Sequence, residues 1–324
     1  MRDPSVAVLL AKGEAPPDGL DLVSPLADVH LVDDAATLAE ALRRAEVMFV
    51  WDFRSGLLRT AWPDDCSVRW IHTGSIGVDV VLVDPVLEGD IVVTNTRGVF
   101  ERPIAEYVLG LILMFAKDLR GTLARQRERR WEHRETETID GARVVILGAG
   151  GVAREVAPLL RAAGMEVQVV GRTARTGDSG LGDVRAGMEV DELLPGADFV
   201  VVALPLTSET RGYLDGRRIG LLSPRARIVN IGRGPLIDED ALLAALRSGA
   251  IAGAALDVFA TEPLPPEHPF WAMDQVVVSP HMSGDRIGWE REVVSRFADN
   301  LRRWLAGEEL RNVVDKRGLR GSRA

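Results

Sequence analysis

The chain has 324 residues, which is enough for about two domains of roughly 100 to 200 residues each. Apolar residues make up 46% of it, an ordinary share for a globular protein, and 39 Lys and Arg against 48 Asp and Glu give a net charge of −9. This balance lacks the broad positive field of a nucleic-acid-binding protein, so we expect no nucleic-acid partner.

The single cysteine, Cys66, cannot form an internal disulfide or a thiolate metal site, so we expect a reducing, cytoplasmic location and no metal. The apolar run Val6 to Ala11 is too short for a secretory signal. The longest apolar stretch, Val108 to Ala116, falls far short of the roughly 20 residues that span a bilayer. We therefore expect no signal peptide and no membrane partner.

Short apolar runs typical of β-strands alternate with a helical pattern in the first hundred residues. A helix is predicted over Ala35 to Arg44, and strands are predicted over Val6 to Leu10, Val47 to Val50, Val68 to His72 and Ile91 to Val93. This alternation is typical of βαβ units, which form parallel sheets.

A longer helical pattern follows, from Pro103 to about Trp131. Proline suits a first helical turn, and Ile104, Val108, Leu111 and Phe115 would share one apolar face. We expect a single interdomain helix here. Its charged part, Arg120 to Glu135, mixes arginine with glutamate, which favours a solvated helix or a dimer arm over a nucleic-acid surface.

A second series of apolar runs predicts another parallel α/β sheet. The strands are expected over Arg143–Leu147, Glu166–Val170, Phe199–Ala203, Arg227–Ile231, Gly253–Val258 and Val276–Ser279. A last helix is predicted over Trp289 to Trp304 because its apolar residues recur at helical spacing. The basic tail after it, Asp315 to Ala324, is expected to be a frayed, solvated terminus.

The first strand of the second series is followed by a glycine motif, GAGGVA, and then by a helical pattern. Gly148 would permit the tight turn, Gly150 would let the backbone approach a pyrophosphate, and Ala153 would stand where helix meets strand. The intervening Gly151 and Val152 begin the helix, whose free amides would hold the phosphates. The sequence thus predicts a dinucleotide site.

The next strand ends in Gly171-Arg172-Thr173, where an NAD site would carry an acidic residue about 20 residues beyond the glycines. That acid is missing. Arg172, with Thr173 and a further candidate in Arg175, offers a guanidinium and a hydroxyl suited to a 2′-phosphate. We expect NADP(H) to be preferred, with NAD(H) possible; the alternative is that these are ordinary loop residues.

Several ordered motifs carry a resemblance to a known family. They are NTRGVFERPIAEYVLG, GAGGVA, ALPLTSETRGYL, IVNIGRGPLIDEDALLAAL, ALDVFATEPLP and VVVSPHMSG. Together, from about Val47 to Asp315, they resemble the D-isomer-specific 2-hydroxyacid dehydrogenases, of the glyoxylate/hydroxypyruvate reductase kind. The resemblance implies two doubly wound parallel-sheet α/β domains of Rossmann and flavodoxin-like type. A cofactor domain at 101–285 would be inserted in a substrate domain at 1–100 plus 286–324, with the active site in the cleft and a homodimer through the cofactor domain.

By motif position, the resemblance implies that Arg233 holds the substrate carboxylate and polarises the keto oxygen, that His281 exchanges the proton, and that Glu262 pairs with His281. A guanidinium forks onto two oxygens and stabilises charge developing on one of them. A carboxylate beside a histidine favours the imidazolium and fixes which ring nitrogen faces the substrate. The chain's other histidines, His30, His72, His133 and His268, are expected to be structural.

The resemblance also implies further contacts. The cofactor would meet Pro205, Thr210, Ile231, Gly232, Asp257 and Gly284, with Asp257 near the nicotinamide carboxamide. In the loop TGSIGVD, the amides of Gly74, Ser75, Ile76 and Gly77 would receive the substrate carboxylate. Trp51 is either a wall of the substrate pocket or a core residue.

The predicted function is reduction of a small 2-keto acid to its D-2-hydroxy acid. Two alternatives remain on the same fold: a nucleotide-sensing, corepressor-like protein, and a cofactor-binding protein without turnover. The presence of Arg233, Glu262 and His281 argues against the second, and the lack of long extensions argues weakly against the first.

Overall fold

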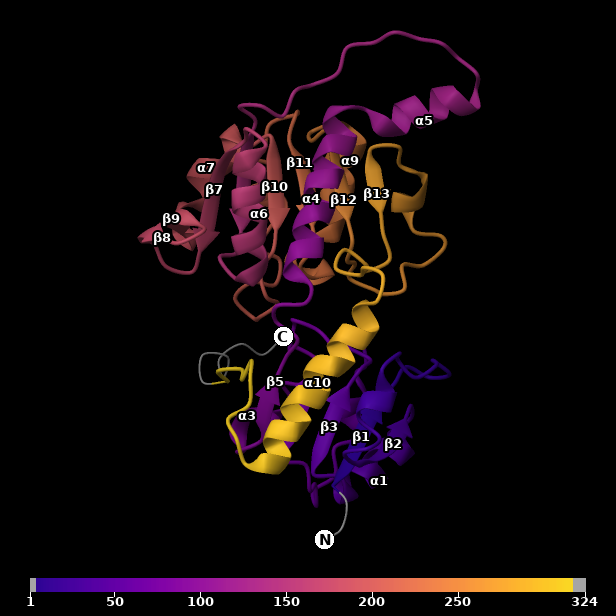
Figure 1. Ribbon diagram of the computed structural model, residues 1–324. Coiled ribbons are helices and arrows are strands. Elements are labelled where there is room, and N and C mark those ends of the chain that lie inside the picture. The colour runs from indigo at the N-terminus through magenta and orange to yellow at the C-terminus, as the bar shows by residue number, and fades with distance from the viewer. Residues whose placement is uncertain (1–3, 317–324) are drawn as a thin grey trace. The chain divides into compact units, whose positions relative to one another are not determined.

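The computed structural model describes residues 4–316, and these fall into two compact units, each built around one sheet (Figure 1). Unit 1 lies within Met1–Phe100 and Arg286–Ala324, and unit 2 is the continuous segment Glu101–Asp285. In the sequence, unit 2 is therefore inserted between the two parts of unit 1. Both are α/β, which confirms the expected fold class.

Unit 1 has five parallel strands in the order β2-β1-β3-β4-β5, the arrangement of flavodoxin-like doubly wound folds. The strands are β1 (Ser5–Leu9), β2 (Asp28–Val32), β3 (Val47–Val50), β4 (Trp70–Thr73) and β5 (Val92–Thr94). The helices are α1 (Ala35–Arg44), α2 (Leu57–Thr60), α3 (Asp84–Glu88) and α10 (Trp289–Ala306), with a 3-10 turn at Leu20–Leu22.

The core of unit 1 combines aliphatic strand residues with a cluster of buried rings. Phe49 of β3 stacks on Phe297 of α10 with ring centroids 4.5 Å apart, and Trp70 of β4 lies 5.4 Å from the same ring. All three side chains are fully buried. Since Phe297 belongs to α10, the last helix completes a core that the first five strands begin.

Unit 2 has eight strands in the order β13-β12-β11-β10-β6-β7-β9-β8, all parallel except β8 against β9. The strands are β6 (Arg143–Leu147), β7 (Glu166–Gly171), β8 (Arg175–Asp178), β9 (Gly182–Ala186), β10 (Phe199–Val202), β11 (Arg227–Asn230), β12 (Gly253–Leu256) and β13 (Val276–Val278). Apart from β8 and the additional strand β13, this is the Rossmann order, whose direction reverses at the first strand, β6. Ligands of such sheets bind at this reversal, beyond the carboxyl ends of the strands.

In unit 2, α4 packs against α6 beside this sheet, whereas α5 projects beyond the end of α4 (Figure 1). The helices of this unit are α4 (Glu101–Ala116), α5 (Leu119–Arg127), α6 (Gly151–Ala162), α7 (Val190–Leu193), α8 (Gly216–Ile219) and α9 (Glu239–Ser248). Four 3-10 turns lie at Gly187–Glu189, Leu194–Gly196, Gly234–Leu236 and Pro269–Ala272.

The prediction of one helix from Pro103 to about Trp131 was wrong. The helix α4 ends at Ala116, and α5 begins at Leu119 after Asp118, whose φ of 44° is left-handed. The Asp118 carboxylate caps the new helix by accepting from the Gly121 amide at 3.0 Å. From Glu128 onward the chain is irregular, up to β6.

Three strands were missed, because their residues are mostly polar or exposed: β2, β8 and β9. The strand predicted over Val68 to His72 is β4, displaced to Trp70–Thr73. The predicted frayed tail is in part wrong, since Lys316 donates to the carbonyl oxygens of Val86 and Gly89 at 2.8 and 3.0 Å. The remainder of that tail lies outside the described residues. Within residues 4–316, no helix is both long and apolar enough to cross a membrane.

Candidate active site

The glycine motif forms a tight turn between β6 and α6, as predicted. Gly148 has a φ of 117°, and a Cβ there would lie 2.4 Å from the carbonyl oxygen of Ala203. Only glycine fits this position. Gly150 is the N-cap of α6 and has no side chain with which to cap it, and a Cβ at Gly150 would meet nothing within 4 Å. The N-cap of α6 thus lies beside open space, which fits the pyrophosphate of a dinucleotide.

Gly151, Val152 and Ala153 form the first turn of α6. Ala153 is 1% exposed, in agreement with a position where helix meets strand. The buried Glu101, at the start of α4, lies beside this turn: its Oε1 would be 3.0 Å from a Cβ placed on Gly151. A side chain at Gly151 would therefore displace this carboxylate.

Arg172 and Thr173 follow β7 directly, and both are exposed. Arg175 has fixed contacts instead: it donates to Asp178 at 2.7 Å and to the carbonyl oxygen of Ala149, in the glycine turn, at 3.3 Å. Asp178 also binds Arg154 of α6 through both its oxygens. Hydrogen bonds from Arg154 and Arg175 lower the pKa of Asp178 to about 2. This part of the site combines two bound arginines with the exposed Arg172.

Arg233 lies in the loop after β11. Its Nη1 donates to the carbonyl oxygen of Gly232 at 2.9 Å. Asn230, at the end of β11, is 1% exposed and holds this loop in place. Its Oδ1 accepts from the Gly232 amide, and its Nδ2 donates to the carbonyl oxygen of Arg233, both at 3.1 Å. Asn230 was not predicted, although a lone amide closing an apolar strand was a usable signal.

Gly234 brings the Arg233 loop against the loop after β12. A Cβ at Gly234 would lie 1.9 Å from the carbonyl carbon of Phe259 and 2.3 Å from the amide nitrogen of Ala260. Since no side chain can be accommodated there, glycine allows the two backbones to touch. The close approach places Arg233 in the neighbourhood of Glu262.

Glu262 and His281 form a hydrogen-bonded pair. The Nδ1 of His281 lies 2.8 Å from Oε2 of Glu262, and the two side chains are 20% and 18% exposed. Because a carboxylate can only accept, Nδ1 carries the proton. The other carboxylate oxygen, Oε1, accepts from the Phe259 amide at 2.9 Å. Glu262 thus fixes the orientation of the imidazole ring and the nitrogen that carries its proton.

The charges around Glu262 favour its ionised form. Burial alone would raise the pKa of this carboxyl. The hydrogen bond and charge of His281, the Phe259 amide and the charge of Arg233 together outweigh burial, so that the pKa of Glu262 is lowered. The carboxylate therefore stays charged beside the imidazole at neutral pH.

The loop that carries His281 is held by Asp257. Asp257 is 1% exposed, its carbonyl oxygen accepts from the His281 amide at 2.8 Å, and its carboxylate accepts from Ser279 Oγ at 2.7 Å. The amides of Met282 and Ser283 donate to the same carboxylate, both at 2.9 Å. These bonds hold His281 at a φ of 54°, a left-handed conformation that is uncommon for histidine. Asp257 therefore has the donors that its burial requires.

Two residues near this loop were not predicted. Ser279 closes β13 and bridges to Asp257. The hydroxyl of Tyr107, on α4, is hydrogen-bonded to Ser279, and burial, opposed by that bond and assisted by the Asp257 charge, raises the pKa of Tyr107. Both residues lie within motifs quoted above, but their mutual contact is made only in the folded chain, and the motifs alone did not reveal it.

The other predicted cofactor residues lie at carboxyl ends of neighbouring strands. Pro205 and Thr210 belong to the loop after β10, and Thr210 Oγ1 donates to the carbonyl oxygen of Pro205 at 2.6 Å. Ile231 and Gly232 follow β11, and Gly284 follows the His281 loop. The structure thus assembles these residues and the three predicted catalytic side chains along one edge of the unit 2 sheet.

The loop predicted to bind a carboxylate follows β4 in unit 1. Ser75 Oγ donates to the carbonyl oxygen of Gly77 at 2.6 Å, and Asn95 Nδ2 donates to that of Ile76 at 2.8 Å. Since its carbonyl groups are bound from within unit 1, the loop is an ordered turn. Gly74 donates its amide to the carbonyl oxygen of Val50, at the end of the neighbouring β3.

Trp51 follows β3 and is 6% exposed. Its ring stacks on that of Trp289, at the start of α10, with centroids 5.1 Å apart and planes 5° apart. Its Cε3 lies 3.3 Å from the position of a Cβ on Gly74. Trp51 is thus both a packed residue and the immediate neighbour of the predicted substrate loop.

The histidines expected to be structural differ in their surroundings. His72 is fully buried in the ring cluster of unit 1, whereas His30, beside Asp28, and His133 are more accessible. His268 lies in unit 2, and its Nε2 is 3.3 Å from Glu239.

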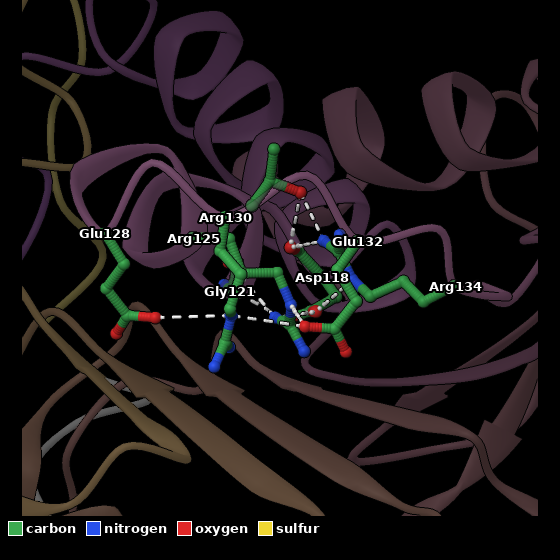
Figure 2. A network of polar contacts seen from close by, with 8 residues as sticks. Asp118, Gly121, Arg125, Glu128, Arg130, Glu132 and Arg134 are labelled. Carbon is green, nitrogen blue, oxygen red and sulfur yellow. Dashed lines mark hydrogen bonds and ion pairs between the residues drawn. The ribbon is translucent and has the colours of Figure 1, made fainter.

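After α5, a charged segment folds back on the helix, and we call residues 119–138 the arm (Figure 2). Asp118 accepts from Arg134 Nε at 2.7 Å, Arg125 pairs with Glu132 at 3.1 Å, and Arg130 lies between Glu128 and Glu132. The arm nevertheless exposes apolar side chains: the exposed fractions are 44% for Leu119, 52% for Leu123 and 102% for Trp131.

Comparison with known proteins agrees with this geometry. Residues 109–283, more than half of the chain, match the family model described as D-isomer specific 2-hydroxyacid dehydrogenase, NAD binding domain. The glyoxylate reductase of Aeropyrum pernix is 31% identical over 324 residues, with 93% of each chain covered.

Two solved structures are similar over nearly the whole chain. The NADPH-dependent glyoxylate/hydroxypyruvate reductase of Sinorhizobium meliloti, in complex with NADP and sulfate, is 27% identical with a TM-score of 0.81, covering 97% of this chain and 99% of that one. A D-isomer specific 2-hydroxyacid dehydrogenase of Xanthobacter autotrophicus, in complex with NADPH and MES, is 32% identical with a TM-score of 0.75, covering 97% and 98%. The chain therefore belongs to the D-isomer-specific 2-hydroxyacid dehydrogenases, oxidoreductases that work with a nicotinamide cofactor.

Proposed function

We propose that the protein reduces a small 2-keto acid, such as glyoxylate or hydroxypyruvate, to the corresponding D-2-hydroxy acid, with NADPH preferred over NADH. The observation that carries this proposal is the His281–Glu262 pair, at 2.8 Å, beside a loop that holds Arg233. An acid–base group and a fixed cation together suit reduction of a keto group next to a carboxylate.

When bound, the reduced cofactor would provide the hydride that adds to the C2 carbon of the keto acid, while the C=O π electrons move to oxygen. The guanidinium of Arg233 binds the substrate carboxylate and stabilises the negative charge on that oxygen. Nε2 of His281 gives its proton to the oxygen, and Glu262 stabilises the imidazolium before that transfer. In the reverse direction, the imidazole takes the proton back.

The residues present fit the cofactor. The turn at Gly148 and the start of α6 would hold the pyrophosphate, and the end of β7, where Arg172 and Thr173 lie, would hold the adenosine. We propose that Arg172 binds the 2′-phosphate, because no acidic residue directly follows β7. Asp178, the first acidic residue after β7, is engaged by two arginines.

In unit 1, we propose that the amides of residues 75–77 receive the substrate carboxylate. The Gly74 amide, which was predicted to join them, already donates to the carbonyl oxygen of Val50 at 2.8 Å. In support, the loop follows a strand at the carboxyl edge of the sheet, and its carbonyl groups are bound by side chains of its own unit. A carboxylate suits amides arranged around glycines.

We also propose a homodimer formed through unit 2, with the arm of one chain covered by a second copy. The support is chemical: an ordered, charged segment exposes Leu119, Leu123 and Trp131. Sedimentation of the wild type and of Leu123→Asp tests it. A dimer that becomes a monomer in the variant is expected, and a monomeric wild type would refute the proposal.

The test of the main proposal is the initial rate of NADPH and NADH oxidation with glyoxylate, hydroxypyruvate, pyruvate and 2-ketoisocaproate. We expect turnover of the smaller acids and a higher kcat/KM with NADPH. Arg172→Asp should shift the ratio of kcat/KM toward NADH, and Arg247→Asp, an exposed arginine at the end of α9, should leave it unchanged. Tight NADPH binding without turnover of any acid would instead support a sensing or idle cofactor-binding protein.

A further inference from the structure

A pair of stacked tryptophans lies beside the loop that follows β4. Trp51 comes directly after β3, and Trp289 is the first residue of α10. Their centroids are 5.1 Å apart and their planes differ by 5°. Phe100 approaches the outer ring, Trp289, at 5.7 Å. Two segments separated by more than 200 residues therefore form a single aromatic wall in unit 1.

The stack fixes the position of the inner ring. Trp51 meets Trp289 face to face and Phe49 edge to face, the latter at 5.9 Å and 75°. Its amide also donates to the carbonyl oxygen of Leu9 at 3.0 Å. With the backbone bound and contacts to two rings, the indole has little freedom to change rotamer.

The inner ring in turn touches the first residue of the loop. A Cβ on Gly74 would lie 3.3 Å from Cε3 of Trp51, so that the indole already occupies the space next to this backbone. Gly74 and Trp51 follow adjacent parallel strands, where Val50 pairs with Thr73. This edge of the sheet is where ligands of such folds bind.

From these contacts we infer that Trp289 is a specificity-determining residue, which positions Trp51 so that the site admits only 2-keto acids with a small group on C2. A larger group beside the bound carboxylate has to displace the Trp51 ring, and stacking on Trp289 opposes that movement. The inference rests on the proposed function, because it needs the substrate carboxylate to be bound by the loop at Gly74.

The chain offers a matched control on the same helix. Trp304 lies 15 residues later on α10, is also partly buried, and packs on Trp70 with centroids 5.7 Å apart. Like Trp289, Trp304 packs on an aromatic side chain of unit 1. Its partner, Trp70, lies at the start of β4, whereas Gly74 follows the other end of that strand. Loss of either tryptophan should cost similar packing, and only loss of Trp289 should change substrate selection.

The experiment compares wild type, Trp289→Ala, Trp289→Phe and Trp304→Ala with glyoxylate and 2-ketoisocaproate at saturating NADPH. In Trp289→Ala we expect the ratio of kcat/KM for 2-ketoisocaproate to that for glyoxylate to rise about tenfold, with a higher KM for glyoxylate. The KM for NADPH should not change. Trp289→Phe keeps a ring in place and should stay close to the wild-type ratio, as should Trp304→Ala.

An unchanged ratio in Trp289→Ala, or an equal change in Trp304→Ala, would overturn the inference while wild-type turnover upholds the proposed function. If the wild type reduces neither acid with either cofactor, both fail together. Should Trp289→Ala not fold, Trp289→Leu retains apolar bulk without a ring and is expected to change the ratio in the same direction.

Discussion

The two units have related sheets, yet each stabilises a buried titratable side chain differently. In unit 2, Asp257 is surrounded by donors: a hydroxyl and two amides bind its carboxylate. In unit 1, His72 has one hydrogen bond, between Nδ1 and Thr94 Oγ1 at 2.7 Å, and no described residue pairs with its buried Nε2. The two units thus treat a buried titratable group differently. In unit 2, loop donors surround a buried carboxylate, whereas the aromatic core of unit 1 favours the neutral form of a buried histidine.

The largest effect is expected for the acid–base group of unit 2. His281→Ala removes the proposed proton donor, so kcat for keto-acid reduction should fall by roughly 10²- to 10⁴-fold. The matched control is His268→Gln, at the other histidine–glutamate pair of unit 2, His268 with Glu239 at 3.3 Å. Steady-state rates at saturating NADPH measure both. A similar fall in the two variants would assign His281 a structural role.

Gly234→Ala should push apart two polar loops of unit 2, the one after β11 and the one after β12. The new methyl group would overlap the backbone of Phe259 and Ala260, at 1.9 to 2.3 Å, which should cost about 3 kcal/mol or more of unfolding free energy. Gly110→Ala, on the exposed face of α4 where a Cβ meets nothing within 4 Å, should instead stabilise by about 1 kcal/mol. Chemical denaturation would measure both changes. Equal stabilities would contradict the close approach.

The exclusion of charge from the aromatic core of unit 1 is tested by the pH dependence of stability. Burial lowers the pKa of His72 from 6.5 to about 3, so the unfolded chain binds a proton in this interval that the folded chain does not. The stability contributed by neutral His72 is therefore fully present above pH 6.5 and is lost as the pH falls toward 3. The slope should approach about 1.4 kcal/mol per pH unit below pH 6.

Denaturant unfolding between pH 7 and 5 measures that slope. His72→Gln should flatten it, whatever the absolute stability of the variant. His30→Gln, at a half-exposed histidine of the same unit, should leave it as in the wild type. Identical slopes in the wild type and His72→Gln would show that His72 does not control the acid response.

The smallest effect is expected for Glu262→Gln. The substitution retains the shape but removes a negative charge beside the imidazole, so the acid–base limb of the kcat profile should move toward lower pH. Measuring kcat from pH 5 to 9 checks this. A stationary limb would leave Glu262 with a purely structural role.

Elements of the fold were predictable from the sequence where the contacts that form them are local along the chain. The strands β3 and β6 and the helix α1 lie where predicted, because their apolar patterns are local signals. The break after α4 was not predictable. Asp118 ends the apolar helix by capping the next one and by binding Arg134, sixteen residues away.

The candidate site follows the same rule. Arg233, Glu262 and His281 were found through motifs, and the 2.8 Å pair of Glu262 with His281 agrees with their placement after neighbouring strands. Asn230 and Tyr107 support these loops through contacts made only in the folded chain. The hairpin β8–β9 was missed because its polar residues are held by ion pairs of Asp178 with Arg154 and Arg175.

The position of α10 has a consequence for biosynthesis. The ring of Phe297 completes the core of unit 1, and the Val314 amide donates to the carbonyl oxygen of Val93 in β5, but both residues are translated only after the whole of unit 2. While the ribosome makes residues 101–285, the first hundred residues lack their covering helix. The nascent amino-terminal half therefore exposes apolar surface, the kind that chaperones bind, and unit 2 can complete its fold first.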